Sequence, residues 1–420
     1  MYFLYILFLA SVICSWNFVS SVVIGLIFIT GITKNKLEKG VFFEKKMINF
    51  FSIGCLLMYI LQITSLLYTE NLNEGFKHIQ LKSGLVLVPM AVYLGNFLNY
   101  AIFRKLMRTF IVVLFITTVY CLIMASVAYW KTHDSSVFFY HQLLLPIEQH
   151  AIQFSILVFV ALVHLLEEAR NRRYYINLVI HFAASVYVLT FLLILSSKLI
   201  IVCFFIYLVY YVALTLKKLS GKRYLVPISI VGFLGISLIL LFTRNPITKR
   251  FNEIMTGEIE LIKEEKFNPG IYFNGLQFRL LEWRFVKEIL NENHAWLVGV
   301  SPADAQHFLD QKYISTNMYI GEPGRGDRGF LGYNTHNQFF ESLLQTGVAG
   351  LSAFVLICIG LIKMAADIRK PELSVVVALL LFYALNESVF ETQYGLMIFL
   401  FFPLFLYLSL SGLKPTGTNK

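Results

Sequence analysis

The sequence predicts an all-α integral membrane protein with about 12 transmembrane helices and one large loop outside the membrane. Of the 420 residues, 57% are hydrophobic and only 14% are charged, whereas soluble globular proteins have about 45–50% apolar and about 25% charged residues. The apolar residues also form runs long enough to cross the roughly 30 Å hydrocarbon core of a bilayer as helices. The composition therefore excludes a soluble enzyme.

The apolar runs predict where the spans lie. We expect the first run to remain as a span, because it lacks the basic start and the small-residue cleavage site of a signal peptide. The twelve runs cover residues 2–15, 17–32, 48–68, 84–102, 109–130, 151–168, 175–195, 199–216, 224–243, 337–362, 373–390 and 396–412.

The distribution of Lys and Arg predicts the orientation. With both termini in the cytoplasm, the inside loops hold 20 Lys and Arg residues and the short outside loops hold four, as the excess of basic residues in cytoplasmic loops requires. The net charge of +10 thus follows from topology. Since no basic run is interleaved with aromatic residues in a polar domain, we expect membrane lipids as partners and no nucleic acid.

Three parts follow from this layout: residues 1–243 with spans one to nine, residues 244–335 as the large outside loop, and residues 336–420 with the last three spans and a cytoplasmic tail. The large loop holds eleven basic and twelve acidic residues and is long enough to be translocated whatever its charge. As the only substantial soluble part, it is where we expect the chemistry.

Within the large loop, the spacing of apolar residues predicts an amphipathic helix over 276–291 with Arg279 on its apolar face. We expect Ser301 to cap a second helix that begins at Pro302. Five glycines in 313–335 predict a mobile lid or loop without regular structure.

The segment Tyr333-Asn334-Thr335-His336-Asn337 stands directly before a long apolar run. We expect Asn334 or Thr335 to cap the following helix, with His336 in its first turn at the outer membrane interface. A neutral imidazole there can accept a proton near neutral pH, and the positive end of the helix disfavours its charged form. His336 is therefore a candidate general base. The alternative is an interfacial histidine that only hydrogen-bonds lipid headgroups or the loop.

Two cations and one acid are candidates to act with this histidine. Lys198 lies in a very short outside turn between spans seven and eight, and Glu387 lies at the outer end of span eleven. Snorkelling is the simpler interpretation for a lone cation near hydrocarbon. Arg279 and Lys198 together would nevertheless suit a pyrophosphate, because Arg binds phosphate oxygens by a fork and Lys by its point charge. Glu387 is either an interface residue or a partner that orients His336 or a cation.

The sequence predicts neither a metal site nor a cofactor. There is no phosphate-binding glycine-rich loop and no dinucleotide fingerprint. The remaining histidines lack the spacing of two metal ligands on one helix; those expected outside are His78, His133, His141, His150, His294 and His307.

Taken together, these segments resemble the O-antigen ligase and O-antigen polymerase superfamily of bacterial envelope glycan transferases. The similar segments occur in the family's order: Ser197-Lys198 resembles its Ser-Arg turn, Arg279-Leu-Leu-Glu-Trp283 its Arg-x-x-x-Trp signature, Gly299-Val-Ser-Pro302 its Gly-Val-Gly-Pro turn, His336-Asn337 its His-Asn motif, LLQTGVAG at 343–350 its Leu-x-x-x-Gly-x-x-Gly motif, and Glu387 its acidic end of span eleven. Two positions depart from the pattern. Lys198 stands where Arg is usual, which keeps the charge and loses the fork, and Ser301 stands where a second glycine is usual.

The resemblance implies a GT-C-type glycosyltransferase in the bacterial inner membrane, with the large loop in the periplasm and an undecaprenyl pyrophosphate-linked glycan as donor. The acceptor would be a sugar hydroxyl of another glycan or of the lipid A core, in lipopolysaccharide biosynthesis. By this resemblance, His336 and Glu387 would be catalytic, Arg279 and Lys198 would bind the donor pyrophosphate, and Trp283, Asn337 and Arg328 would support them. The reaction would be inverting and metal-independent.

Other functions remain open from the sequence. Within the family, a polymerase would join repeat units on the lipid carrier, and a third branch would transfer glycan to protein hydroxyls. From another class, a twelve-span transporter or lipid flippase would usually show two related halves and charged residues near the bilayer midplane. Here the halves differ, because the large loop follows span nine. This difference argues against a transporter. Within the family we favour the ligase, because the compact twelve-span plan and the single large loop with the Arg-Trp and His-Asn signatures resemble it most.

Overall fold

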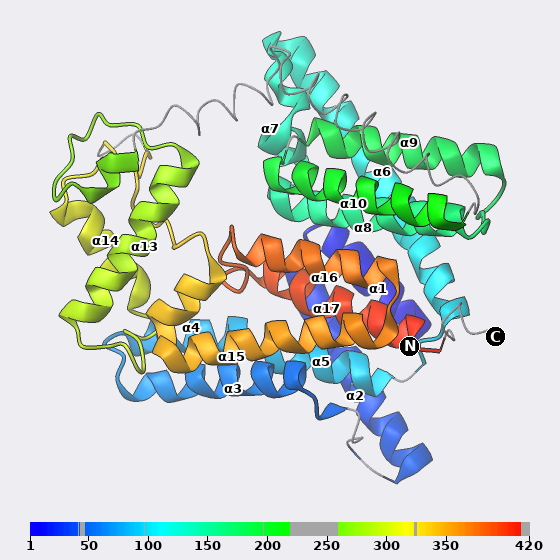
Figure 1. Ribbon diagram of the computed structural model, residues 1–420, viewed down its shortest axis with the longest axis horizontal. Helices are drawn as coiled ribbons and strands as arrows, with labels where there is room; N and C mark the ends of the chain where they lie inside the picture. The colour runs from blue at the N-terminus through cyan, green and yellow to red at the C-terminus, as the bar shows by residue number, and fades with distance from the viewer. Residues whose placement is uncertain are drawn as a thin grey trace.

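The computed structural model describes residues 1–40, 42, 47–95, 97–195, 197–218, 259–322 and 326–412 (Figure 1). Over these residues the chain forms helices and no strand. The predicted span at 224–243 and the first part of the large loop lie outside the described residues. The helical structure agrees with the predicted all-α membrane class.

Seven segments of the described chain are long and apolar enough to cross a membrane. They lie in α2 (Asn17–Lys39), α3 (Phe50–Thr64, continued by η2, Ser65–Leu67), α6 (Tyr100–Thr132), α8 (Ala151–Arg170), α10 (Lys198–Lys218), α15 (Gln338–Ile368) and α17 (Gln393–Leu410). Three shorter helices are also apolar: α1 (Tyr2–Ile13), α9 (Leu178–Ile194) and α16 (Pro371–Ala384). The described chain is therefore a multi-pass membrane protein.

Helices α8 and α17 form the centre of the bundle. In each of them 83% of the span is buried inside the protein, against 28–44% in the other five. A helix that is apolar all round is expected to be buried on every side. The α17 side chains Phe401 and Phe405 accordingly pack against Tyr5 of α1, and Phe402 packs against Phe110 of α6.

The structure corrects the sequence prediction around residues 84–108. A single span was expected at 84–102, followed by a cytoplasmic loop at 103–108. Instead α5 (Gly84–Gly95) ends early, and α6 continues through the basic residues without a break. Asn99 caps α6 by accepting a hydrogen bond from the amide of Ile102 at 3.0 Å. Arg104 can lie within the helix because its charge is neutralised there: its Nε donates to Glu168 of α8 at 2.5 Å.

Residues 259–335 have a hydrophobic core of their own at one end of the bundle (Figure 1). It is built on η5 (Ile259–Lys263), α13 (Gly275–Glu292) and α14 (Ala305–Ser315). Leu281 and Phe285 of α13 and Tyr313 of α14 are fully buried in it. The predicted helix at 276–291 is confirmed by α13. We call η5, α13, α14 and the loops that join them the helical cap.

The second predicted helix begins later than expected. The sequence placed its cap at Ser301 and its first residue at Pro302, whereas α14 begins at Ala305 after Asp304. Ser301 has a left-handed backbone, with φ of 77°, and forms part of a turn. This conformation favours glycine, which is the residue usual there in the family that the sequence resembles.

That turn, residues 296–301, docks on a break in α15. The helical dihedrals of α15 are interrupted at Thr346 and Gly347. Gly347 has φ of 66°, and a Cβ atom there would lie 2.3 Å from the backbone of Leu297. Only glycine allows both the backbone angle and the close approach. We call residues 296–301 the docked turn.

Backbone hydrogen bonds explain why the docked turn belongs at this break. An interrupted helix leaves carbonyl and amide groups without partners, and these groups need partners when buried. The docked turn supplies them through Val300 N–H to the Leu344 carbonyl at 2.9 Å, Ser301 N–H to the Gln345 carbonyl at 3.1 Å, and Val348 N–H to the Trp296 carbonyl at 2.8 Å. The helical cap is thereby fixed to the same helix that follows His336.

A second attachment joins the helical cap to residues 68–70, which connect η2 to α4 (Leu72–Lys82). The Tyr68 hydroxyl donates to the Val298 carbonyl at 2.6 Å. The Asp304 carboxylate accepts from the Thr69 hydroxyl at 2.8 Å and from the Glu70 amide at 3.0 Å. These contacts and the docked turn hold the helical cap, with α13, at one end of the bundle.

Candidate active site

Helix α13 presents three polar or aromatic side chains toward the bundle. Arg279, Glu282 and Trp283 are three and four residues apart, so they share one face of the helix. The start of α13 is fixed by a capping box, in which Asn274 accepts from the Gln277 amide at 3.0 Å and the Gln277 side chain accepts from the Asn274 amide at 2.9 Å. The position of this face is thus set from the first turn.

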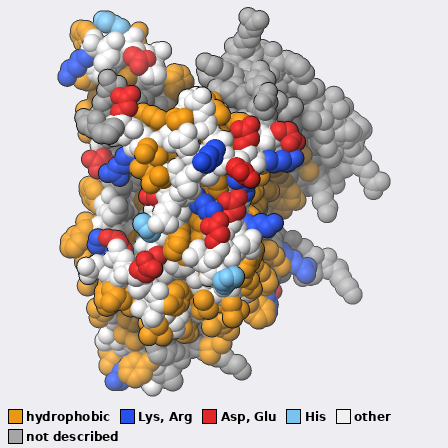
Figure 2. All heavy atoms as spheres, turned by 90° about the vertical axis from the view of Figure 1, so that its left-hand side faces the viewer, with side chains coloured by type: hydrophobic (Ala, Val, Ile, Leu, Met, Phe, Trp, Pro, Cys, Tyr) orange, Lys and Arg blue, Asp and Glu red, His pale blue; other side chains and the backbone are white. Residues whose placement is uncertain are grey.

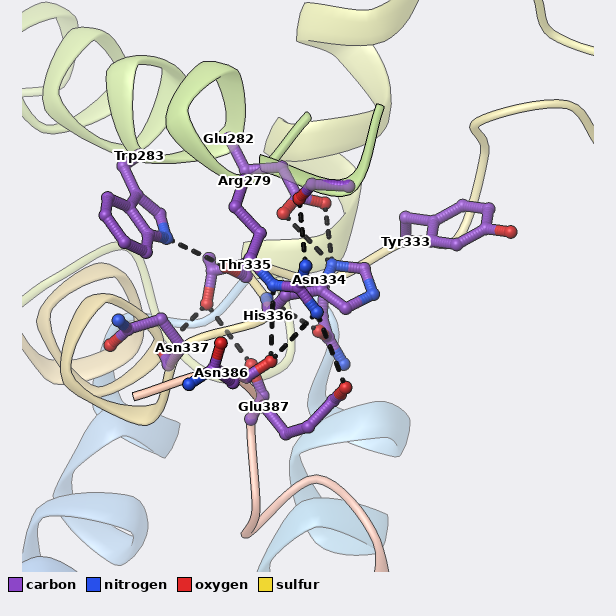
Figure 3. Close-up of polar contacts among 12 residues, drawn as sticks. Arg279, Glu282, Trp283, Tyr333, Asn334, Thr335, His336, Asn337, Asn386 and Glu387 are labelled. Carbon is purple, nitrogen blue, oxygen red and sulfur yellow. Dashed lines mark hydrogen bonds and ion pairs between the residues drawn. The ribbon is translucent and has the colours of Figure 1, made fainter. Parts of the chain in front are cut away.

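His336 lies just before α15, not in its first turn as the sequence predicted. The helix begins at Gln338, and its cap is Asn337, whose side chain accepts from the Phe339 amide at 2.9 Å. His336 itself has a left-handed backbone, with φ of 46°, and its amide donates to the Asn334 side chain at 3.0 Å. This local turn, rather than a helical turn, directs the imidazole toward α13 (Figure 3).

The imidazole of His336 pairs with Glu282. Its Nδ1 lies 3.0 Å from both carboxylate oxygens. The Glu282 side chain is fully buried, whereas 21% of the His336 side chain is exposed. A carboxylate bound to Nδ1 favours the tautomer that carries hydrogen on Nδ1 and leaves Nε2 free to accept a proton. No described hydrogen bond involves Nε2.

The pair shifts the pKa of both groups. Burial raises the pKa of Glu282 to about 7, against the opposing hydrogen bond and charge of His336. Burial alone would lower the pKa of His336, but the hydrogen bond and charge of Glu282 and the charge of Glu387 raise it above 6.5 overall. The sequence had predicted that a helix end would disfavour the charged imidazole. The structure shows the opposite, because a buried carboxylate stabilises that form.

Arg279 bridges α13 and the loop after α16. Its Nη1 donates to the Gly275 carbonyl at 2.8 Å, and its Nη2 and Nε donate to the Asn386 carbonyl at 3.3 and 3.4 Å. Nη2 also lies 3.7 Å from the Glu387 carboxylate. A guanidinium has five N–H donors, so these three bonds leave two of them available to an anion.

Glu387 therefore faces a cation. From the sequence, Glu387 was either an interface residue or a partner that orients His336 or a cation. The structure places it beside Arg279, while Glu282 contacts the histidine. Burial raises the pKa of Glu387, and the charges of His336 and Arg279 oppose that shift. Glu387 thus belongs to the same electrostatic cluster.

Trp283 and Asn337 anchor the segment around His336. The indole of Trp283 stacks on Phe340 of α15, with ring centroids 4.8 Å apart and an interplanar angle of 7°. Its Nε1 donates to the Thr335 carbonyl at 3.1 Å. The Asn337 side chain donates to the Leu385 carbonyl at 3.0 Å. Both residues hold the histidine segment against neighbouring elements from either side.

A buried acid lies under the same segment. Glu341, one turn into α15, accepts from the Thr335 amide at 3.2 Å and from the Thr335 hydroxyl at 2.8 Å. It also accepts from the Ser388 hydroxyl at 3.2 Å and from the Gln345 side chain at 2.7 Å. The segment before His336 and the loop that carries Glu387 therefore share one acceptor.

The described contacts of the site do not include the two remaining predicted site residues, Lys198 and Arg328. Lys198 is the first residue of α10 and is half-buried there. Arg328 is exposed in the loop between α14 and α15. Among the contacts described for His336, Arg279 and Glu387, none involves Lys198 or Arg328. Figure 2 looks onto this end of the molecule and shows charged side chains gathered over the middle of it, with hydrophobic side chains toward its lower part.

Sequence reasoning missed Glu282 and Glu341. A signal for Glu282 was present, because it follows Arg279 by three residues and so shares its helical face. Glu341 occupies the fifth position after His336 in a helix that was otherwise considered as a membrane span. The sequence offered no sign that this acid would be buried beneath the loop.

Comparison with known protein families supports the resemblance to O-antigen ligases. Residues 183–355 match the O-antigen ligase family model, a family of glycosyltransferase-like ligases and polymerases. A search of curated proteins gave no match to the chain. The matched range contains Lys198, α13, His336 and the docked turn with its break in α15, whereas Glu387 lies beyond it. Over residues 183–355, which include α13, His336 and the break in α15, the chain is therefore similar to the O-antigen ligase family.

Proposed function

We propose that this protein is an O-antigen ligase-like glycosyltransferase. It transfers an undecaprenyl pyrophosphate-linked glycan to a sugar hydroxyl of the lipid A core at the periplasmic face of the bacterial inner membrane. The observation that carries this proposal is the His336–Glu282 pair, which leaves Nε2 of the imidazole without a described hydrogen bond in a cluster that also holds the guanidinium of Arg279. A base next to a phosphate-binding cation is what transfer from a pyrophosphate donor requires.

The proposed reaction is a single displacement. The acceptor hydroxyl gives its proton to Nε2 of His336, and its oxygen forms a bond to the anomeric carbon of the donor glycan. The bond between that carbon and the pyrophosphate oxygen breaks on the opposite face, so the configuration inverts. Undecaprenyl pyrophosphate leaves with the electron pair, and Glu282 stabilises the imidazolium formed on His336.

Arg279 would stabilise the charge that develops on the leaving pyrophosphate. Its two uncommitted N–H groups can form a fork with phosphate oxygens. Glu387 would hold the guanidinium in place, at 3.7 Å. Lys198 would add a second positive charge from the start of α10. Removing one such donor commonly costs about 10²–10³ in rate.

Reconstitution tests the proposal. The purified protein would be placed in liposomes with undecaprenyl pyrophosphate-linked glycan and lipid A core, both extracted from its host. We expect glycan to appear on lipid A core with the wild-type protein and with His307→Ala, a control at an exposed histidine on α14. We expect none with His336→Ala at equal protein level. Transfer by His336→Ala would remove this histidine from the mechanism.

The same assay separates the alternatives. A polymerase would lengthen the glycan on its lipid carrier and leave lipid A core unmodified. A transporter or flippase would move labelled lipid-linked glycan across the liposome membrane without forming a new glycosidic bond. Either result would replace the ligase assignment.

A further inference from the structure

The ring of Tyr333 stands beside the proposed base and is open to solvent. Its side chain is 46% exposed, and its ring centroid lies 5.6 Å from that of His336, with the planes tilted by 32°. No described hydrogen bond involves the Tyr333 hydroxyl. Figure 3 shows Arg279, His336 and Tyr333 in that order across the site, with Tyr333 pointing away from the buried cluster.

The backbone of Tyr333 is fixed although its ring is exposed. Its carbonyl accepts from the buried Tyr313 hydroxyl at 3.0 Å and from the Gln306 side chain at 3.1 Å. Its ring packs edge-to-face on Phe278, with centroids 5.5 Å apart at 88°. An exposed aromatic ring that is held so firmly serves as a rigid surface rather than as a mobile side chain.

We propose that Tyr333 is the platform on which the acceptor pyranose stacks. This inference rests on the proposed function, because it takes Nε2 of His336 as the atom that receives the hydroxyl proton. The face of an aromatic ring is electronegative and attracts the polarised C–H groups on the apolar face of a pyranose. A sugar ring lying on Tyr333 would bring a hydroxyl at its edge to the neighbouring imidazole.

The arrangement also separates the two substrates. Arg279 lies on the side of His336 away from Tyr333 (Figure 3), so the pyrophosphate and the acceptor would approach the base from opposite sides. In an inverting displacement the incoming hydroxyl and the leaving pyrophosphate lie on opposite faces of the anomeric carbon, so a separate binding position for each substrate suits this reaction. Tyr333 is thus a binding residue for the acceptor and has no role in binding the donor.

A split between kinetic constants tests this assignment. With the reconstituted assay, Tyr333→Leu should raise KM for lipid A core about tenfold, which is the loss expected from one aromatic contact. KM for the lipid-linked glycan and kcat at saturating acceptor should stay within about threefold. Tyr333→Phe, which keeps the ring, should behave as wild type. Tyr272→Leu is the control, since Tyr272 is 78% exposed in the same helical cap.

A binding measurement separates failure of this inference from failure of the proposed function. Saturation-transfer NMR with methyl β-glucopyranoside and methyl N-acetyl-β-glucosaminide reports sugar contact without any transfer reaction. We expect contact with the His336→Ala protein and its loss with Tyr333→Leu. If Tyr333→Leu binds these sugars as wild type does, or raises KM for the donor instead, the platform assignment is wrong. If sugars bind at Tyr333 but no transfer occurs, the proposed function fails and the sugar site stands.

Discussion

Replacing Glu282 by Gln is the most informative single change in the site. The substitution keeps the shape of the side chain and removes its charge. In the wild-type protein both carboxylate oxygens lie 3.0 Å from Nδ1 of His336, and the carboxylate is fully buried. A hydrogen bond to a charged group contributes about 1.5–3 kcal/mol. If all of it acts on the imidazolium formed during transfer, kcat should fall about 10- to 100-fold, since about 1.4 kcal/mol corresponds to a factor of ten.

The pH dependence provides a second, independent readout. The base acts in its neutral form, so activity rises as pH increases through the pKa of His336. Glu282 raises that pKa by its hydrogen bond and its charge, whereas burial lowers it. Removing the charge should therefore move the rising limb of kcat/KM to lower pH, while the plateau falls. A purely structural role for Glu282 would lower the plateau without moving the limb.

The assay is transfer in liposomes across a pH series, with Glu288→Gln as the matched control. Glu288 lies in the same helix, is partly exposed, and pairs with Arg284 at 2.6 Å, away from His336. We expect this control to leave both the plateau and the limb unchanged. The reasoning would be refuted if Glu282→Gln kept the wild-type kcat and the wild-type limb.

Three further changes test other parts of the structure. Arg279→Lys keeps the charge and loses the fork, so kcat should fall about 10²-fold with little change in acceptor KM; an unchanged kcat would show that the fork is not used. Gly347→Ala places a Cβ atom against the docked turn in a strained backbone conformation, so the free energy of unfolding should fall by roughly 1–3 kcal/mol or more. Gly25→Ala is the control: a Cβ atom there meets no atom within 4 Å, and this variant should melt at the wild-type temperature. Lys82→Met removes the lysine 2.5 Å from the buried carboxylate of Glu391 and, among the described residues, leaves it only His78, at 4.0 Å, as a cationic partner. The change should cost on the order of 3–5 kcal/mol, which thermal unfolding in detergent would reveal.

The sequence predicted the helical class and the amphipathic helix at 276–291, because apolar runs and helical spacing are local properties. The sequence-based prediction was wrong where a residue far along the chain determines whether a helix forms. The basic residues at 103–108 looked like a loop, yet α6 continues there because Glu168, far along the chain, neutralises Arg104. Whether a helix continues or ends at such a position depends on tertiary contacts, which a local sequence pattern does not contain.

The site shows the same division. The order of the motifs identified Arg279, His336 and Glu387 as site residues, and these three residues lie close together in the structure. The residue that contacts the imidazole is nevertheless Glu282, because a turn at residues 334–336 places His336 outside the helix and directs it to α13. A left-handed histidine before a helix cap cannot be read from sequence, since its conformation is imposed by the neighbours that fix the turn.

The central claim is that His336 serves transfer of lipid-linked glycan to the lipid A core. The most direct measurement deletes the gene in its own host, restores either wild type or His336→Ala, and compares surface lipopolysaccharide with extracted lipid-linked glycans. We predict that deletion removes long chains from the core and accumulates them on undecaprenyl pyrophosphate, and that wild type but not His336→Ala reverses this. Unchanged pools on deletion, single repeats left on the core, or rescue by His336→Ala would contradict the account.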